Sequence, residues 1–330
     1  MKKPPAKIRL KKDRGRRTKK YIPPPSRQER VHVLETGTLT EMRAAKAYFE
    51  SLARFHHLFY SELTYQRLLH QEQINQALNL AAISDYEFSG WQRVVKYKYS
   101  LHPLSTVGSV KDIGGRFNVG QEINPENYPV FHALYIAENK DTAFQETLGQ
   151  VESPELVAAG MTKNQIVLTK EDSISVLKIQ GKLDRVIDLT QIERLKPFVD
   201  IIKKFTVSDA LYKMADELKV PAPTMIKTVA QLKEALFQNN WRETPREFDI
   251  PSASQVFGQI VKSAKIEGVL YTSKFTNKKC LAIFPENLVD TSSHFELADP
   301  VAYPNTPKRI DANSWRKCLL DAKEFLTNLR

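Results

Sequence analysis

Apolar residues recur at helical spacing near the start of the chain. Between residues 38 and 83 these positions include Met42, Ala45, Phe49, Leu52, Phe59, Leu63, Leu68, Leu69, Ile74 and Leu78. Steps of three or four residues predict one or two amphipathic helices with an apolar stripe. Thr38 and Glu41 precede the stripe with the spacing of a capping box. Such helices either pack on the following domain or mediate self-association.

From Trp91 onward the chain carries short apolar runs that are typical of strands. These runs are 93–95, 134–137, 166–168, 174–179, 269–271 and 281–284. Helical patterns follow Asp141 and cover 255–264. Because strands and helices alternate irregularly, the pattern predicts an α+β fold rather than repeated parallel βαβ units.

Residues 200–250 interrupt the strand-like runs and predict a mostly helical insertion. One predicted helix begins at Ser208-Asp209, and another covers about Met225 to Phe237. The chain ends in a further predicted helix. Its apolar stripe consists of Trp315, Cys318, Leu319, Ala322, Phe325 and Leu326.

Composition is ordinary for a globular protein. The chain has 330 residues, of which 42% are hydrophobic and 26% charged, so it can bury a sizeable core. No apolar run approaches the roughly 20 residues of a membrane helix, and the N-terminus lacks an apolar signal segment. Cys280 and Cys318 have no metal-ligand spacing. We therefore expect buried thiols, a cytoplasmic location, no metal site and no membrane contact.

The formal net charge of +11 belongs to the N-terminal tail. Residues 1–30 hold 13 Lys and Arg against two acidic residues, so the rest of the chain sums to zero. Like charges repel, which favours a disordered, solvated tail. The alternative is non-specific phosphate contact with nucleic acid or a ribosome surface. We therefore divide the chain into a basic disordered tail (1–30), an N-terminal helical region (31–85) and a main domain (86–330).

The run Gly114-Gly115-Arg116-Phe117-Asn118 carries the first candidate chemistry. Glycine lets the backbone approach a ligand closely, and arginine binds phosphate oxygens with a planar fork. One short strand later, Glu146 occupies the second turn of a predicted helix. A carboxylate there can support a sugar cation or deprotonate the attacking group. The pair suits a substrate with both a phosphate and a glycosidic carbon.

Three further polar residues stand in or beside predicted strands. Arg93 interrupts an apolar run, Tyr135 alternates with aliphatic neighbours, and Ser273 follows the run 268–272. Each alone has a common structural explanation, such as a surface ion pair or a turn serine. A Walker A loop, a nucleophile elbow and a complete dinucleotide fingerprint are all missing from the sequence.

Together these segments resemble the RES family, which is named for its arginine, glutamate and serine. The matching segments are Gly114–Asn118, Leu134–Ala137, Thr142–Glu146, Gln255–Gly258 and Gly268–Ser273, with Trp91–Val94, Ile187–Leu189, Asn277 and Leu281–Phe284 also fitting. The resemblance covers roughly residues 86–290. The chain departs from it at 121–132, in the 200–250 insertion and in the first 85 residues.

The resemblance implies an ADP-ribosyltransferase-like fold, with a split mixed or antiparallel sheet, flanking helices, an N-terminal helical extension and a helical insertion. It implies that the 86–330 domain is catalytic and uses NAD+ as its substrate, without a separate cofactor. Nicotinamide would be released by phosphorolysis, with inorganic phosphate as a second substrate, or by hydrolysis. Several members are toxins held inactive by an antitoxin, so an antitoxin partner is expected as well.

The resemblance also implies a role for each candidate residue. Glu146 stabilises an oxocarbenium-like transition state or orients the attacking water or phosphate. Arg93 and Arg116 hold the pyrophosphate or the attacking phosphate, and Tyr135 stacks on nicotinamide or lines its pocket. Ser273 hydrogen-bonds ribose or phosphate and helps to set Glu146. It is not expected to be a covalent nucleophile, because no histidine stands in a recognisable relay with it.

Two other functions stay open at this point. The same fold can transfer ADP-ribose to a protein or nucleic acid, and the basic tail makes RNA or DNA a conceivable acceptor. The second alternative is not an enzyme. In that case the tail and the helices at 38–83 form a nucleic-acid or ribosome-binding module on a degenerate globular domain.

Overall fold

The computed structural model describes residues 39–96, 99–148, 174–299 and 306–327. Its chain divides into two compact units. The smaller contains Met1–Phe59 and Val207–Pro223, and the larger contains Tyr60–Thr206 and Thr224–Arg330. Every predicted site residue belongs to the larger unit.

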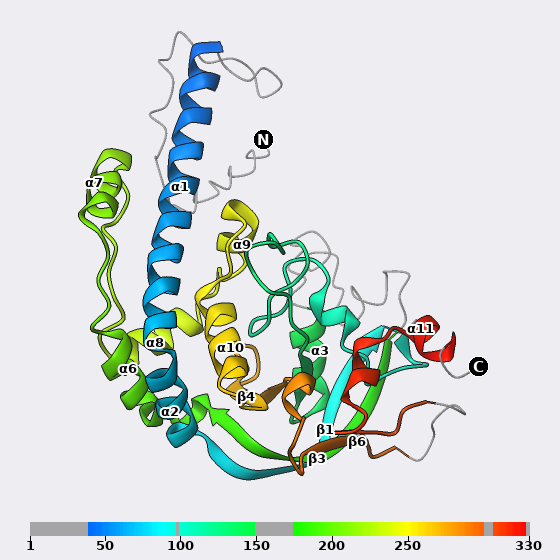
Figure 1. Ribbon diagram of the computed structural model, residues 1–330. Helices are drawn as coiled ribbons and strands as arrows, with labels where there is room; N and C mark the ends of the chain where they lie inside the picture. The colour runs from blue at the N-terminus through cyan, green and yellow to red at the C-terminus, as the bar shows by residue number, and fades with distance from the viewer. Residues whose placement is uncertain (1–38, 97–98, 149–173, 300–305, 328–330) are drawn as a thin grey trace, which may run out of the picture. The chain divides into compact units, whose positions relative to one another are not determined.

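A mixed sheet forms the centre of the larger unit. Its strands are β1 (Ile83–Lys96), β2 (Leu134–Ala137), β3 (Ile174–Asp188), β4 (Gly268–Thr272), β5 (Lys279–Ile283), β6 (His294–Leu297) and β7 (Arg309–Asp311). Their order is β1-β2-β5-β4-β3-β6-β7, and β1 also pairs with β3. The first five strands in this order therefore close into a barrel, and β6 and β7 extend from β3. Figure 1 shows β1 and β3 as long curved ribbons that run side by side.

The length of β3 explains how the barrel closes. Ile174 to Val186 pair antiparallel with β1, while its last residues pair parallel with β4, where Val186 is opposite Gly268. The other strand pairs are antiparallel. The predicted α+β class is thus confirmed. The predicted strand at 134–137 coincides with β2, whereas the one at 166–168 lies outside the described residues.

Short strands of the barrel are buried on both faces. In β2, Leu134 and Ile136 join one apolar cluster, while Ala137 joins the other. Leu281 and Ala282 of β5 separate in the same way. Because both faces are covered, these strands read as continuous apolar runs. The free thiols of Cys280 and Cys318 are buried, as expected from the sequence.

Helices cover the sheet and carry parts of the site. In the larger unit they are α2 (Gln71–Ala81), α3 (Lys140–Leu148), α6 (Lys196–Ile202), α8 (Val229–Leu236), α9 (Glu243–Phe248), α10 (Ala253–Ser263) and α11 (Ala322–Thr327), with 3-10 turns η2 (Val107–Val110), η3 (Leu189–Leu195), η4 (Pro285–Asn287) and η5 (Trp315–Leu319). α10 packs against β4 and α2 (Figure 1). Ser252 and Gln255 form a reciprocal capping box that sets where α10 begins.

The prediction of one or two helices over 38–83 is confirmed, and the structure has two, α1 (Leu39–Leu69) and α2. Thr38 of the predicted capping box lies outside the described residues. α1 contributes residues to both units. Within the smaller unit, the Tyr48 hydroxyl donates to the Leu218 carbonyl at 3.3 Å. The tail at 1–30 is not described, and the domain boundaries at 31–85 and 86–330 stay predictions.

The 200–250 segment is mostly helical, as predicted. α7 (Asp209–Leu218) follows Ser208 at the expected position. The next helix, α8, begins at Val229 rather than near Met225, because the Thr228 side chain accepts a hydrogen bond from the Gln231 N–H and caps it.

The prediction of one continuous C-terminal helix over 315–326 is wrong. η5 ends at Leu319, Leu320 is extended, and α11 begins only at Ala322. The reason is tertiary. His102 hydrogen-bonds the Lys317 carbonyl, and the Ser105 hydroxyl donates to that of Leu320. Carbonyls that already have partners in the 102–106 loop do not need a helical one.

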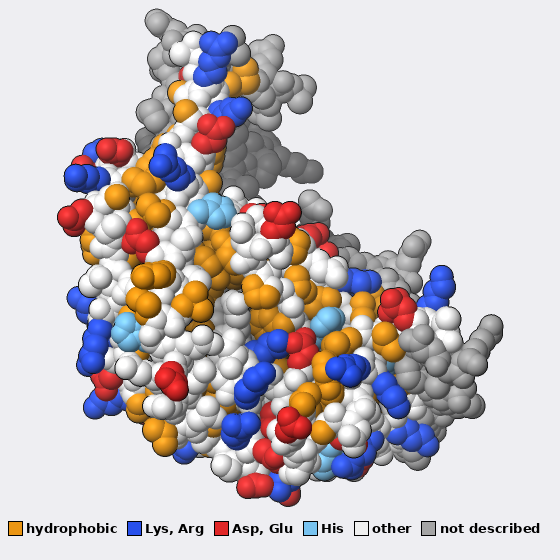
Figure 2. Space-filling model, viewed as in Figure 1, with side chains coloured by type: hydrophobic (Ala, Val, Ile, Leu, Met, Phe, Trp, Pro, Cys, Tyr) orange, Lys and Arg blue, Asp and Glu red, His pale blue; other side chains and the backbone are white. Residues whose placement is uncertain are grey.

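Basic and acidic side chains are interspersed over the face shown in Figure 2, with apolar side chains between them. This agrees with the near-zero net charge of the chain after residue 30. No helix in the described ranges is long and apolar enough to cross a membrane.

Candidate active site

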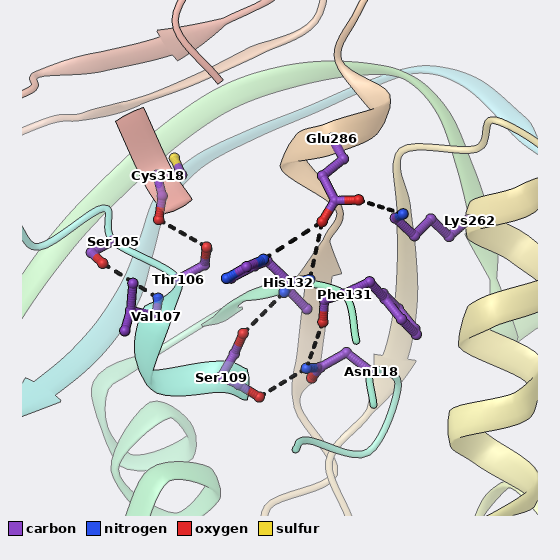
Figure 3. A network of polar contacts seen from close by, with 11 residues as sticks. Ser105, Thr106, Val107, Ser109, Asn118, Phe131, His132, Lys262, Glu286 and Cys318 are labelled. Carbon is purple, nitrogen blue, oxygen red and sulfur yellow. Dashed lines mark hydrogen bonds and ion pairs between the residues drawn. The ribbon is translucent and has the colours of Figure 1, made fainter. Parts of the chain in front are cut away.

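The loop that carries Arg116 is held by one buried amide. Asn118 Oδ1 accepts from the Gly115 N–H at 3.0 Å. Its Nδ2 donates to the Ser109 and Phe131 carbonyls at 2.8 and 3.0 Å (Figure 3). Gly114 has φ +88°, in the left-handed region that favours glycine. Gly114 and Gly115 therefore allow the chain to turn, and Asn118 holds the turn in place.

Helix α10 packs against the same loop and hydrogen-bonds its carbonyls. Gln255 Nε2 lies within hydrogen-bond distance of the carbonyls of Ile113 (2.7 Å), Gly115 (3.1 Å) and Asn118 (3.1 Å). One turn later, a Cβ on Gly258 would lie 2.0 Å from the Phe117 carbonyl oxygen. Glycine at this position lets the loop backbone rest directly on the helix.

Tyr135 on β2 joins the loop to the barrel. Its hydroxyl accepts from the Phe117 N–H at 3.0 Å and donates to Asn118 Oδ1 at 2.8 Å. Burial raises the pKa of Tyr135, which keeps the phenol protonated and able to donate. The sequence predicted a ligand-facing tyrosine. The structure adds a second task, which is to hold the arginine loop.

Replacing Tyr135 with Phe is expected to lower the free energy of unfolding by about 1–3 kcal/mol, because it leaves the buried Phe117 N–H without its partner. Urea denaturation measures the change. Tyr212→Phe, at an exposed tyrosine on α7, provides the control and should leave the midpoint unchanged. Equal midpoints for Tyr135→Phe and the parent would show that the hydroxyl does not hold the loop.

Glu146 lies in the second turn of α3. Asn139 caps this helix by accepting from the Thr142 N–H at 2.9 Å, and Asp141 lies in the first turn of the helix. Ser273, just after β4, donates its hydroxyl to Glu146 Oε1 at 2.7 Å, and its Oγ accepts from the Phe275 N–H. The serine is buried, while the carboxylate faces the pocket described below.

Arg116 extends toward the insertion. Its Nη1 donates to the Leu236 and Gln238 carbonyls, each at 3.3 Å. Its guanidinium carbon lies 5.5 Å from the centre of the Trp241 ring. Burial lowers the pKa of Arg116, although a guanidinium stays charged at neutral pH. The insertion thus positions the arginine that the sequence singled out.

Arg93 lies on β1 at another part of the same pocket. Its Nη2 donates to the Ser105 carbonyl at 2.7 Å. Its buried Nε has no hydrogen-bond partner among the described residues. Burial lowers the pKa of Arg93 to about 10, so it remains a cation at neutral pH. A buried donor without a partner is costly, which makes this N–H a candidate contact for a ligand acceptor.

One pocket of about 490 Å³ brings the predicted residues together. Arg93, Arg116, Tyr135 and Glu146 line it, and Ser273 hydrogen-bonds the glutamate. Pockets of roughly 300–1,000 Å³ are typical of small-molecule sites. The predicted residues therefore converge, while their individual roles in catalysis and binding stay predictions.

Sequence reasoning missed part of this pocket. Trp241 and Arg242 come from the insertion, and Lys96 and Lys111 also line it. Trp241-Arg242 follows two asparagines in a turn and precedes α9, so no strand or glycine-rich context marked the pair. No group of three or more His, Cys, Asp or Glu side chains suited to a metal ion occurs in the part of the chain that the structure describes.

A second polar cluster lies beside Asn118 and Phe131 (Figure 3). Glu286 in η4 pairs with Lys262 of α10 and with His132, whose Nδ1 is 3.6 Å from Glu286 Oε1. Burial by itself would raise the pKa of Glu286, but hydrogen bonds from His132 and Lys262 outweigh it and lower the pKa to about 2. Phe131 directly precedes His132, and its carbonyl accepts a hydrogen bond from Asn118 Nδ2. The cluster is therefore joined to the loop that carries Arg116.

The RES domain family matches residues 91–304, more than half of the chain. The chain belongs to the RES domain family. All five predicted site residues of this RES domain fall within the matched span, and the resemblance stated from the motifs is confirmed.

Among solved structures, the chain is similar to the crystal structure of the M. tuberculosis MbcT–MbcA toxin–antitoxin complex. The identity is 13%, the match covers 75% of this chain and 97% of that one, and the TM-score is 0.38. The comparison with curated proteins found no match.

Proposed function

We propose that this RES domain consumes NAD+ by cleaving its nicotinamide–ribose bond, with inorganic phosphate or water as the acceptor. Family membership supports NAD+ as the substrate, because the RES proteins that the chain resembles degrade it. The observation that carries the proposal is the pocket in which a serine-held carboxylate, Glu146, faces the same space as Arg93 and Arg116.

The bond to be broken explains why one carboxylate suffices. Nicotinamide leaves from a pyridinium cation, so its departure needs no strong general acid. Positive charge then develops on the ribose as the transition state approaches an oxocarbenium ion. A carboxylate beside that carbon stabilises the charge. The hydrogen bond from Ser273 keeps one oxygen of Glu146 fixed, which orients the carboxylate before the reaction starts.

Cations around the pocket suit the phosphates of the substrate. Arg93 offers a buried N–H that lacks a protein partner in the described ranges, and Arg116 uses only Nη1 on the insertion carbonyls. Both guanidiniums therefore retain donors for oxyanions. Tyr135 lines the pocket, and its hydroxyl is already hydrogen-bonded to Asn118. Its ring is the proposed surface for nicotinamide.

Incubating the purified protein with NAD+, with and without phosphate, tests the proposal. Mass spectrometry identifies free ADP-ribose after hydrolysis, or its phosphorylated form after phosphorolysis. Absence of nicotinamide release under both conditions would refute the function.

The toxin role, an antitoxin partner and an ADP-ribosyltransferase-like fold are part of the same proposal and rest on the motif resemblance. Transfer of ADP-ribose to a macromolecule would use the same bond cleavage. Labelled NAD+ incubated with cell lysate separates the two reactions. Label on protein or nucleic acid would indicate transfer, and label on small products only would indicate degradation.

Replacing Arg116 with Ala is expected to weaken NAD+ binding by about 1.5–3 kcal/mol, the usual cost of a lost charged hydrogen bond. Calorimetry on a Glu146→Gln background measures this affinity without turnover. Arg316→Ala removes a guanidinium that also stacks on a tryptophan but is not among those lining the pocket, and should leave the affinity unchanged. Unchanged affinity in Arg116→Ala would refute its phosphate role.

A further inference from the structure

The insertion contributes an aromatic side chain that holds two arginines. Trp241 is only 4% exposed, so its ring is not an open platform for a ligand base. The Arg242 guanidinium carbon lies 4.4 Å from the ring centre and that of Arg116 lies 5.5 Å from it. One indole thus positions a guanidinium from the glycine-rich loop and a second one from the insertion.

Stacking leaves the donors of Arg242 available. A guanidinium over an aromatic face keeps its N–H groups in their own plane, where they still reach oxyanions. Across the described ranges no side chain or carbonyl accepts a hydrogen bond from the Arg242 guanidinium. The residue is exposed and lines the pocket. Arg242 is therefore held by the indole while its guanidinium N–H groups remain available to a ligand.

Two neighbouring cations without an anion between them repel each other. Partial loss of hydration lowers the pKa of Arg242, although the residue is exposed, and the charges of Arg116 and Arg246 lower it further. Glu146 acts on both guanidiniums from a distance, without an ion pair to either. An anion that contacts both arginines relieves this repulsion and gains charge-assisted hydrogen bonds.

We propose that Arg242 and Arg116, held by Trp241, form a diphosphate subsite in which Arg242 binds the second phosphate of the substrate. For NAD+ this group is the pyrophosphate, and in that respect the subsite rests on the proposed function. Arg242 then determines specificity, because a substrate with two linked phosphates engages both arginines and a mononucleotide engages one. The insertion thereby becomes part of the substrate site.

Calorimetry with inorganic pyrophosphate and the full chain tests the subsite directly. Arg242→Ala is expected to weaken pyrophosphate binding by about tenfold to a hundredfold, as for loss of a charged hydrogen bond. The matched control is Arg246→Ala, which removes the same charge from α9 at an exposed position outside the pocket lining. It should change the affinity by less than about twofold, given the small effect of screened surface charges. Urea unfolding confirms that both variants are folded.

Three results would overturn the subsite. They are an equal loss in Arg242→Ala and Arg246→Ala, no loss in Arg242→Ala, and no pyrophosphate binding by the parent. Inorganic phosphate is the second probe. If Arg242→Ala weakens phosphate binding but not pyrophosphate binding, the residue holds the attacking phosphate instead, and the proposal is wrong.

Kinetics separate this inference from the proposed function. With NAD+, Arg242→Ala should raise KM more than it lowers kcat, and with nicotinamide mononucleotide its effect on KM should be smaller. Arginine-dependent pyrophosphate binding without nicotinamide release would leave the subsite standing and refute NAD+ cleavage. If Arg242→Ala turned over NAD+ with the same KM and kcat as the parent, NAD+ cleavage would stand and the subsite would be refuted.

Discussion

Replacing Glu146 with Gln is expected to lower nicotinamide release from NAD+ by about 10²-fold or more, the usual effect of removing transition-state charge stabilisation. Glutamine has the same shape and still offers an oxygen to the Ser273 hydroxyl, which now lies 2.7 Å from the carboxylate. Only the negative charge is lost. Because that charge acts on a cation that develops in the transition state, NAD+ affinity should change little.

Chromatographic assay of nicotinamide measures the rate for this variant, and calorimetry measures the affinity. Glu126→Gln, in an exposed loop, removes one carboxylate elsewhere and should behave like the parent. Near-equal rates for Glu146→Gln and the parent would remove Glu146 from the mechanism. Loss of NAD+ affinity with an unchanged kcat would assign it to substrate binding alone.

Gly258→Ala is expected to lower the free energy of unfolding by about 1–3 kcal/mol, the usual cost of forcing an extra methyl into a packed site. The new Cβ would lie 2.0 Å from the Phe117 carbonyl oxygen, and a backbone atom cannot rotate away as a side chain does. The sign of this change in unfolding free energy is informative, because alanine stabilises an ordinary helix interior by about 1 kcal/mol relative to glycine. The loop that carries Arg116 must shift, so NAD+ turnover should fall as well.

Urea denaturation of Gly258→Ala and Gly108→Ala provides the comparison. A Cβ on Gly108 meets nothing within 4 Å, so that variant should stay within about 0.5 kcal/mol of the parent, as at unremarkable positions. A stabilised Gly258→Ala would show that the loop does not rest on α10.

Local patterns were sufficient where a short stretch of chain decides its own conformation. The alternation around Tyr135 marked β2 at its observed limits, and the stripe from residue 38 to 83 marked α1 and α2. The motif set led to the RES family, because each motif reports a local need. Asn118 and Gly114 meet such a local need, because the turn requires a left-handed glycine and the asparagine side chain holds it. Gly258 is the exception, because it leaves room for Phe117, which is far away in sequence.

Contacts between residues far apart in sequence determined the features of the fold that the local patterns did not predict. Closure of the barrel depends on β1 pairing with β3, about 90 residues later, and no local period records such a partner. The strands β6 and β7 have four and three residues, too few to show a period. The break after η5 arises from carbonyls taken by the 102–106 loop.

The site divides in the same way. By itself the sequence determined the fold class, the family and the five candidate side chains, because residue type and spacing reflect local backbone needs and chemistry. The resemblance already implied that Ser273 helps to set Glu146, and the structure supplies the hydrogen bond between them. Only the tertiary structure decided that Tyr135 holds the arginine loop and that Trp241 and Arg242 complete the pocket. The physical reason is that hydrogen bonds and ring contacts depend on distance in space, which chain order does not specify.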